Sequence, residues 1–130
     1  MAKFKTYGLS HIALAVKNVQ RSVEFYKNIF GAKIMYLEKT WAQIQTPFSN
    51  DIIALEENKK LAGKNSGGIM HFGFRLRKAS DIAHVKDALK KAKAKIIDEG
   101  EFVPGSPYVF FLDPDGYEIE IWYEKLVSNK

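Results

Sequence analysis

The chain of 130 residues contains one pattern twice, and this internal repeat is the feature that most limits its possible folds. The segments GLSHIALAVKNVQRSVEFYKNIFGAKI and GIMHFGFRLRKASDIAHVKDALKKAKAKI each begin with Gly-X-X-His in an alternating run and end in Ala-Lys-Ile. Their histidines, His11 and His71, lie 60 residues apart, and the two triplets lie 62 residues apart. A repeat of this kind indicates one supersecondary unit that the chain uses twice.

The first copy has the pattern of a strand, a helix and three further strands. Residues 8–16 alternate between apolar and polar or small side chains, as a strand does. Asn18 is a favourable N-cap for a helix whose apolar residues recur every three or four positions, and Gly31 can end that helix. The strands expected after the helix are 32–38, 40–46 and 51–57.

The second copy repeats this order after a linker at residues 58–68, whose composition is typical of a loop. A strand is expected at 69–77, and then a helix at 80–93 with Ser80 as its N-cap. This helix should bury Ile82, Val85, Leu89 and Ala92. The last strands are expected at 95–99, 107–113 and 117–124, with a long loop at 100–107.

The two copies predict an α+β fold of two βαβββ modules within a single domain, residues 1–130. Module one spans about 8–57 and module two about 69–124. The chain has no cysteine, which excludes disulfides and thiolate zinc sites and favours a cytoplasmic location. It contains no run apolar enough for a membrane helix, so no membrane association is expected. The net charge of +5 is spread over lysines without an arginine-rich stripe, so no nucleic-acid partner is expected either.

Alternation along the first strand of each copy separates an apolar face from a face that carries the histidine. The apolar faces hold bulky residues that should pack on the helices. The histidine faces are otherwise small or polar: His11, Ala13 and Ala15 in the first copy, and His71, Gly73 and Arg75 in the second. Such a face is poor core material and suits the wall of a cavity.

A carboxylate is expected on the same face. After the turn Asp113-Pro114-Asp115-Gly116, the run YEIEIWYE alternates, so that Glu118, Glu120 and Trp122 point to one side. Two histidines and one carboxylate from separate strands form a ligand set for Fe(II), Mn(II), Ni(II) or Zn(II), and they leave coordination positions for substrate. The alternative is a hydrogen-bonded structural histidine with a solvated glutamate.

These stretches resemble the vicinal oxygen chelate superfamily, which includes glyoxalase I, extradiol dioxygenases, fosfomycin-resistance enzymes, methylmalonyl-CoA epimerase and bleomycin-resistance proteins. The segments LSHIALAVKNVQRSVEFYKNIFGAKI, MHFGFRL and FFLDPDGYEIEIWYE carry the resemblance, which covers about residues 8–124. It implies a curled mixed sheet around a metal and substrate cavity, with His11, His71 and Glu120 as metal ligands.

The resemblance further implies a homodimer and a metalloenzyme. Its substrate would be a small molecule that chelates a divalent ion, Fe, Mn, Ni or Zn, through adjacent oxygens. The reaction would be that of a lyase, isomerase or dioxygenase. The alternative is a bleomycin-resistance-like protein that binds a small molecule without turnover, although such proteins generally lack the metal triad that this chain retains.

Three departures from known members leave the reaction unassigned. Ala54 stands opposite Glu120 when the two copies are aligned, where glyoxalase I supplies a fourth ligand. Ala13 replaces a hydroxyl residue of the fosfomycin thiol transferases. Phe110 replaces a tyrosine that those enzymes and the extradiol dioxygenases use.

Other residues are candidates for the site by type and position. Glu56 or Gln43 is a candidate for assisting proton transfer. Arg75 can pair with an anionic substrate, or it can form a surface ion pair. Trp41 and Gln43 line the site or face outward, depending on the register of their strand. The remaining substrate-binding candidates, for which core packing is the alternative, are the aromatic residues Tyr108, Phe110 and Trp122.

Overall fold

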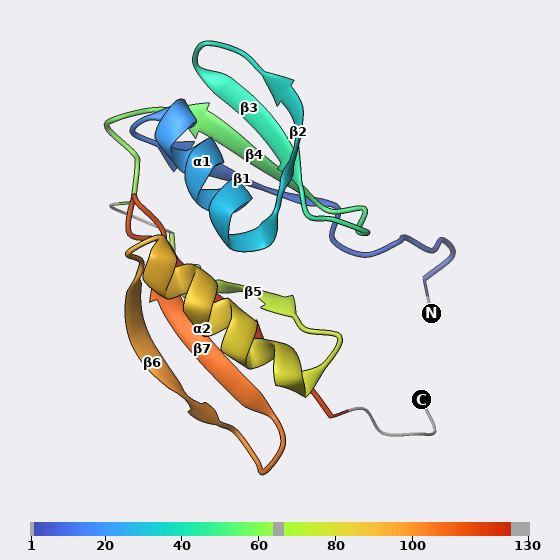
Figure 1. Cartoon of the computed structure of the whole chain (residues 1–130). Coiled ribbons are helices and arrows are strands. Elements are labelled where there is room, and N and C mark those ends of the chain that lie inside the picture. The colour runs from blue at the N-terminus through green and yellow to red at the C-terminus, as the bar shows by residue number, and fades with distance from the viewer. Residues whose placement is uncertain (1, 64–66, 126–130) are drawn as a thin grey trace. The chain divides into compact units, whose positions relative to one another are not determined.

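The computed structural model of the chain describes residues 2–63 and 67–125. The chain divides into two compact units, residues 1–62 (unit 1) and residues 63–130 (unit 2). The boundary falls inside the expected linker, of which residues 64–66 lie outside the described residues. Each unit holds a four-stranded mixed sheet and an α-helix, so the predicted α+β fold with two βαβββ modules is confirmed (Figure 1).

Unit 1 contains the first module. Its elements are β1 (His11–Val16), α1 (Val19–Phe30), β2 (Lys33–Leu37), β3 (Trp41–Gln45) and β4 (Ile52–Glu57). The strands lie in the order β1-β4-β3-β2, with β1 parallel to β4 and the other pairs antiparallel. The chain therefore crosses over α1 before it returns through an antiparallel meander to lie beside its own first strand.

Unit 2 contains the second module and repeats this topology. Its elements are β5 (Phe72–Arg75), a short 3-10 helix η1 (Ala79–Asp81), α2 (Ile82–Lys91), β6 (Lys95–Glu101), β7 (Pro107–Leu112) and β8 (Glu118–Trp122). The strand order is β5-β8-β7-β6, again with one parallel pair, β5 with β8.

The ends of α1 follow the sequence prediction. The side chain of Asn18 accepts a hydrogen bond from the backbone N–H of Arg21 at 2.9 Å, which satisfies one of the free donors of the first turn. Gly31 adopts the left-handed conformation, with φ 68°, and its N–H donates to the carbonyl of Lys27. The helix buries Val19, Val23 and Tyr26, as its spacing predicts, and it packs on β3 and β4.

The start of the second helix differs from the prediction. Ser80 is not an N-cap, because residues 79–81 form the 3-10 turn and α2 begins only at Ile82. The N–H of Asp81 donates instead to the carbonyl of Lys78, so the backbone itself supplies the first hydrogen bond. Of the four residues expected to be buried on this helix, only Leu89 is fully buried, and Ile82, Val85 and Ala92 are half-buried.

The long loop expected at 100–107 is a tight hairpin. The strand β6 continues to Glu101 and β7 already begins at Pro107. The backbone N–H of Phe102 donates to the carbonyl of Ser106 at 3.1 Å, and the carboxylate of Glu101 accepts from the N–H of Gly105 at 2.8 Å. Gly105 has φ 89°, a conformation that favours glycine, and this allows the chain to turn within five residues.

The two sheets share a further irregularity. The pairing of β2 with β3 shifts by one residue at Met35, and the pairing of β6 with β7 shifts at Ile97. Both bulges directly follow the Lys-Ile of the repeated triplet, so the repeat extends to a backbone detail.

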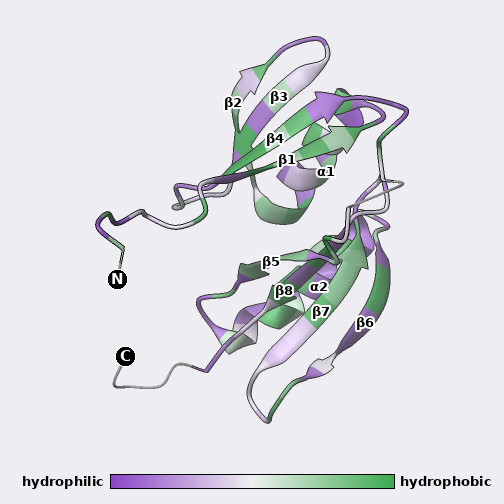
Figure 2. Cartoon of the chain, turned by 180° about the vertical axis from the view of Figure 1, so that it is seen from behind, coloured by the Kyte–Doolittle hydropathy of each residue, from purple (hydrophilic) through white to green (hydrophobic). Residues whose placement is uncertain are grey.

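The strand β4 is hydrophobic over most of its length and hydrophilic at its final glutamates (Figure 2).

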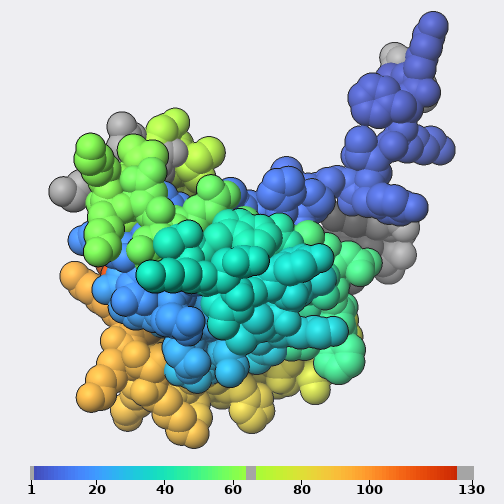
Figure 3. Space-filling view, turned by 90° about the horizontal axis from the view of Figure 1, so that it is seen from above, coloured from blue at the N-terminus to red at the C-terminus, as the bar shows by residue number. Residues whose placement is uncertain are grey.

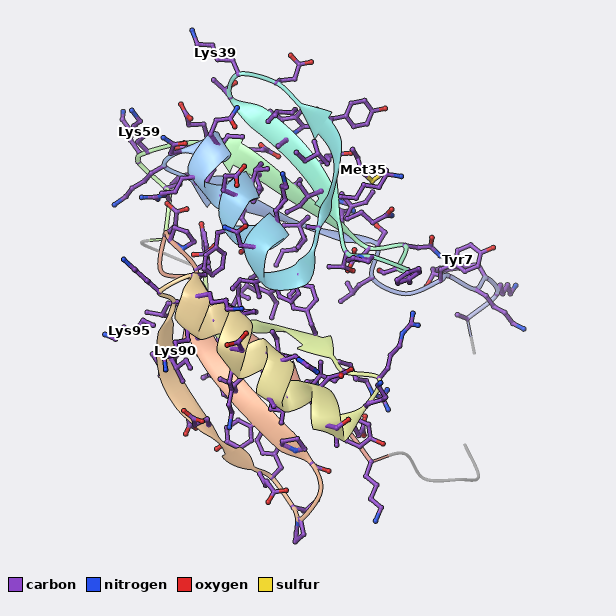
Figure 4. The ribbon with its side chains drawn as sticks, in the orientation of Figure 1. Tyr7, Met35, Lys39, Lys59, Lys90 and Lys95 are labelled. Atoms are coloured by element: carbon purple, nitrogen blue, oxygen red, sulfur yellow. The ribbon has the colours of Figure 1, made fainter. Side chains whose placement is uncertain are left out.

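The N-terminal segment before β1 extends away from the body of unit 1 (Figure 3). Its aromatic residue Tyr7 is fully exposed (Figure 4). Lysines lie at separate places on each unit: Lys39 between β2 and β3, Lys59 after β4, Lys90 on α2 and Lys95 at the start of β6. Among the described residues, no helix is both long enough and apolar enough to cross a membrane.

Candidate metal centre

One face of the unit 2 sheet gathers the candidate residues of the second module. Glu120 on β8 lies between Gly73 on β5 and Phe110 on β7 in the strand register. In the next row, Trp122 lies between Arg75 and Tyr108. Register partners point to the same side of a sheet, so the five side chains share a face, to which Gly73 contributes none. The neighbouring Ile119 and Ile121 point to the other side and are buried there.

His71 and Glu120 approach each other on this face. Nε2 of His71 lies 3.6 Å from Oε1 of Glu120, which is too long for a hydrogen bond. Two ligand bonds of about 2.1 Å that meet at a tetrahedral angle place their donor atoms about 3.4 Å apart. The imidazole nitrogen and carboxylate oxygen therefore have the separation that a shared metal ion requires, and both donor types suit Mn, Fe, Ni and Zn.

Glu120 is a buried acid. The residue is 8% exposed, and burial raises the pKa of its carboxyl, while the nearby His71 opposes this change. Gly73 packs closely against this residue: a Cβ at position 73 would lie 3.3 Å from the carbonyl oxygen of Glu120, a tight contact, and 3.6 Å from Oε1, an ordinary van der Waals contact. A buried carboxyl with a raised pKa beside a histidine is typical of a functional site.

Aromatic rings border this pair. The ring of Phe110 packs edge-on against His71, with centroids 5.0 Å apart. Phe102 stacks on Tyr108 at 4.1 Å and meets Trp122 edge-on at 6.1 Å. Sequence reasoning missed Phe102 because it assigned this residue to a loop. The signal was available, because after the bulge Asp98 and Gly100 alternate onto this face and Phe102 is the next position of that alternation.

Tyr108 forms a hydrogen bond across to the neighbouring strand β6. Its hydroxyl donates to Oδ2 of Asp98 at 3.2 Å, and burial together with the charge of Asp98 raises the pKa of the tyrosine. Gly100 leaves room for the ring, since a Cβ there would lie 3.3 Å from the tyrosine oxygen. The side chain of Tyr108 is therefore neutral. It is half-buried and so does not belong to the core, which was the alternative interpretation of the sequence.

Arg75 also lies at this face but already has a partner. Its Nη2 is 3.2 Å from Oε1 of Glu124, and both side chains are more than a third exposed. This contact is the surface ion pair of the alternative interpretation, and an exposed pair of this kind adds little stability. The guanidinium remains near the row of Trp122 and Tyr108.

Unit 1 carries its candidates on the equivalent face. Ala54 lies between Ala13 and Gln43 in the strand register, in the position that Glu120 occupies in unit 2. The alignment of the two copies from sequence is therefore supported residue by residue. Trp41 is the register partner of Glu56, and its ring lies 5.8 Å from that of Tyr36.

His11 begins β1 and is exposed. Its Nδ1 lies 2.7 Å from the hydroxyl of Ser10. Within the residues that the structure describes, no group of three or more His, Cys, Asp and Glu side chains is arranged to hold a metal ion. The pair of His71 and Glu120 belongs to unit 2 and His11 to unit 1, and the complete ligand set stays a prediction.

Comparison with protein families gives the same assignment as the fold. Residues 8–121 match the Glyoxalase/Bleomycin resistance protein/Dioxygenase superfamily. The chain belongs to this superfamily. The resemblance that three sequence motifs indicated is thereby confirmed over nearly the whole chain.

Relatives within the superfamily include enzymes with different reactions. The chain is 25% identical to a trivalent organoarsenical cleaving enzyme of Bacillus sp. strain MD1, over 89% of this chain and 73% of that protein. It is 32% identical to the mitochondrial methylmalonyl-CoA epimerase of Dictyostelium discoideum, over 78% of this chain and 68% of that protein. Such relatives favour an enzyme of the superfamily without defining its reaction.

Solved structures share the fold. The fosfomycin resistance protein FosX of Listeria monocytogenes, in complex with Mn(II) and sulfate, matches with a TM-score of 0.77 at 22% identity. The match covers 94% of each chain. At this identity the likeness establishes the superfamily fold alone.

Proposed function

We propose that this superfamily member is a metal-dependent enzyme that acts on a small substrate through two adjacent oxygens. The observation that carries the proposal is the separation of 3.6 Å between Nε2 of His71 and Oε1 of the buried Glu120. At this separation the carboxylate and the imidazole are too far apart for a hydrogen bond, but both can bind the same divalent ion. The Mn(II) bound by the related FosX structure adds support for an ion at such a site.

The ligands in this proposal are His71, Glu120 and His11. A bound divalent ion, Fe, Mn, Ni or Zn, would act as a Lewis acid that polarises the substrate oxygens. Glu120 supplies a negative charge that offsets the charge of the ion, and the two imidazoles bind in their neutral form. Only three protein ligands are assigned, which leaves positions for two oxygens of a substrate.

The surrounding side chains bind and orient the substrate in this proposal. Phe110, Tyr108 and Trp122 form an aromatic wall beside the ligand pair, and Trp41 is the corresponding aromatic candidate on the sheet face of unit 1. Arg75 recognises a negatively charged group of the substrate after exchanging its exposed partner Glu124. Proton transfer is assigned to Glu56, which is exposed and free to move, with Gln43 orienting a substrate oxygen.

A second candidate is a binding protein without turnover, similar to the bleomycin-resistance proteins. The observation that favours it is the stack of Phe102 on Tyr108, since a wall of exposed aromatic rings binds planar molecules without any ion. Ala54 favours it as well, because the fourth ligand of glyoxalase I is missing. The two candidates differ in one respect, namely whether a chelator abolishes ligand binding.

The test is elemental analysis of the purified chain together with a His71→Ala variant. We expect a divalent ion in the wild-type protein and background metal in the variant, because a ligand has been removed. His84→Ala is the matched control, since His84 is an exposed histidine on α2. Equal, negligible metal in the wild type and the His71 variant would overturn the proposal.

We also propose that the chain forms a homodimer. The edge strand β2 supports this proposal, because all five of its residues are exposed and four of them, Ile34 to Leu37, are large and apolar. An exposed apolar edge is a template for pairing with another chain. Light scattering would give the mass of a dimer, and a Met35→Lys variant, with a charge on the bulge, should be monomeric.

A further inference from the structure

We infer that Ser10 and Glu118 are positioning residues that hold the proton of each candidate ligand histidine on Nδ1. Ser10 acts on His11 and Glu118 acts on His71. The Nε2 atom of each ring is thereby left unprotonated and available as a donor to a metal ion. The inference rests on the proposed function for its purpose, but it concerns the metal-free chain and can be tested there.

The first observation is that His71 lies between two carboxylates of one strand. Its Nδ1 is 3.8 Å from Oε2 of Glu118, and its Nε2 is 3.6 Å from Oε1 of Glu120. Glu118 is a third exposed, so rotation of its terminal torsion can close the gap to a hydrogen bond. Glu120 is buried against Gly73 and is much less free to move. The two carboxylates thus differ in role, although both face the same ring.

The second observation comes from the other repeat. Nδ1 of His11 lies 2.7 Å from the hydroxyl oxygen of Ser10, a short hydrogen bond. A serine hydroxyl can accept or donate, and the inference requires that it accepts from the Nδ1–H. In both repeats Nδ1 thus faces a polar group that is not a candidate ligand, whereas Nε2 of His71 faces the candidate ligand Glu120.

The chemistry of imidazole explains that task. A neutral ring carries one proton, and the nitrogen that binds a metal must be the other one. Ligand histidines in metal sites commonly donate their second N–H to a carboxylate or another acceptor, which fixes both the tautomer and the plane of the ring. The edge-on contact of Phe110 with His71 restricts the same ring from another side.

The repeats reach this arrangement with different residues. The strand partner of His11 is Ile52, whereas Glu118 lies next to His71 because Phe72 pairs with Ile119. Conversely, the residue before His71 is Met70, which cannot replace Ser10 as an acceptor. The acceptor for Nδ1 is therefore not part of the repeated sequence pattern. Each half supplies its own acceptor for Nδ1, and this makes each acceptor separately removable.

The experiment is long-range proton–nitrogen correlation NMR of the full-length, nitrogen-15-labelled chain with chelator present. Spectra are recorded at about pH 8.5, roughly two units above the ordinary histidine pKa, so that the rings are neutral. His84, exposed on α2, serves as the internal reference. We expect His11 and His71 to carry the proton on Nδ1, with both Nε2 resonances in the unprotonated position.

Paired variants separate positioning from a structural role. Glu118→Leu should move the proton of His71 toward Nε2 and leave His11 unchanged, whereas Glu118→Gln, which keeps an acceptor, should retain the wild-type signal. Ser10→Ala should affect only His11, and Ser10→Thr should restore it. An Nε2–H signal at either ring of the wild type would overturn the inference for that ring. A Glu118→Leu spectrum in which the His71 ring signals are unaltered would likewise overturn the inference for His71.

A titration with Zn(II) distinguishes this inference from the proposed function. Loss of such an outer acceptor typically weakens metal affinity by about 10- to 100-fold, and we expect this for Glu118→Leu. If the wild type binds no Zn(II) while Nδ1 carries the proton, the proposed function fails and the tautomer assignment stands. If Zn(II) binds while Nε2 carries the proton in the metal-free chain, the assignment of Ser10 and Glu118 fails instead.

Discussion

The two units have the same strand order, with their first and last strands parallel and a bulge at the same position. Among the described residues, however, buried carboxylates occur in unit 2 and not in unit 1. In unit 1 the central row of the sheet face contains Ala13, Ala54 and Gln43. In unit 2 the same row contains Gly73, Glu120 and Phe110. The register is identical at these positions, so the difference lies entirely in the side chains.

The two faces differ at two neighbouring positions around the buried carboxylate. Unit 2 has the donor Glu120 where unit 1 has Ala54, and it has Gly73 where unit 1 has Ala13. A Cβ at position 73 would press on the backbone carbonyl of Glu120 at 3.3 Å. The strand partner of the histidine of unit 1, His11, is Ile52 and not a carboxylate.

The largest effect is expected from giving unit 1 the missing carboxylate. Ala54→Glu should destabilise the chain by about 3 kcal/mol, because it buries a charge at a position that is now 6% exposed. The double variant Ala13→Gly, Ala54→Glu should recover part of this loss, because it recreates the arrangement of unit 2. Urea denaturation measures both. Equal stabilities of the single and double variants would show that space is not the limiting factor.

A smaller effect is expected from removing the charge of unit 2. The folded pKa of Glu120 is raised, mainly by burial, so its contribution to stability is complete below the unfolded value of about 4.3 and is lost as the pH rises through the folded pKa. Glu120→Gln cannot ionise. Without metal, the variant should therefore gain stability relative to wild type as the pH rises from 4 to 7.

Denaturation with urea across this pH range, in the presence of chelator, measures the difference between the two proteins. Glu99→Gln is the control, because Glu99 is an exposed glutamate of the same sheet, paired with Lys86 at 2.9 Å. A stability difference for Glu120→Gln that does not change with pH would contradict the role of burial.

The smallest effect on stability is expected from Gly73→Ala, which gives unit 2 the alanine of unit 1. Its new Cβ would lie 3.3 Å from the carbonyl oxygen of Glu120, and the lower entropy of the unfolded chain offsets part of the strain. We expect a change in unfolding free energy below about 1 kcal/mol. Metal affinity should nevertheless fall, because the backbone of Glu120 must move slightly to relieve this contact and it carries the carboxylate with it.

Gly100→Ala is the matched control for this variant. Its Cβ would meet a neighbouring oxygen at the same distance of 3.3 Å on the same sheet, but that oxygen is the hydroxyl of Tyr108 and not the backbone carbonyl of Glu120. Zn(II) titration of both variants should show weaker binding only for Gly73→Ala. Equal affinities would mean that the space beside Glu120 does not control the site.

Much of the fold could be predicted from the sequence, because its signals are local. The periodicity of α1 and its caps at Asn18 and Gly31 depend on residues within one or two turns, and all three predictions were confirmed. The prediction of Ser80 as an N-cap was wrong, and the connecting loop expected at 100–107 is present but shorter, because the backbone had alternatives. A 3-10 turn replaced a side-chain cap, and Gly105 allowed a tighter turn than the composition suggests.

The sequence by itself determined the repeat, the faces of the strands and the equivalence of Ala54 with Glu120, since alternation and internal alignment need no distances. Only the tertiary structure decided which carboxylate is buried, which ring nitrogens have neighbours, and that Phe102 joins the aromatic wall. These properties depend on β5 meeting β8 and on β6 meeting β7 in a particular register. Residues far apart in the chain come together there, and a local pattern contains no information on their separation.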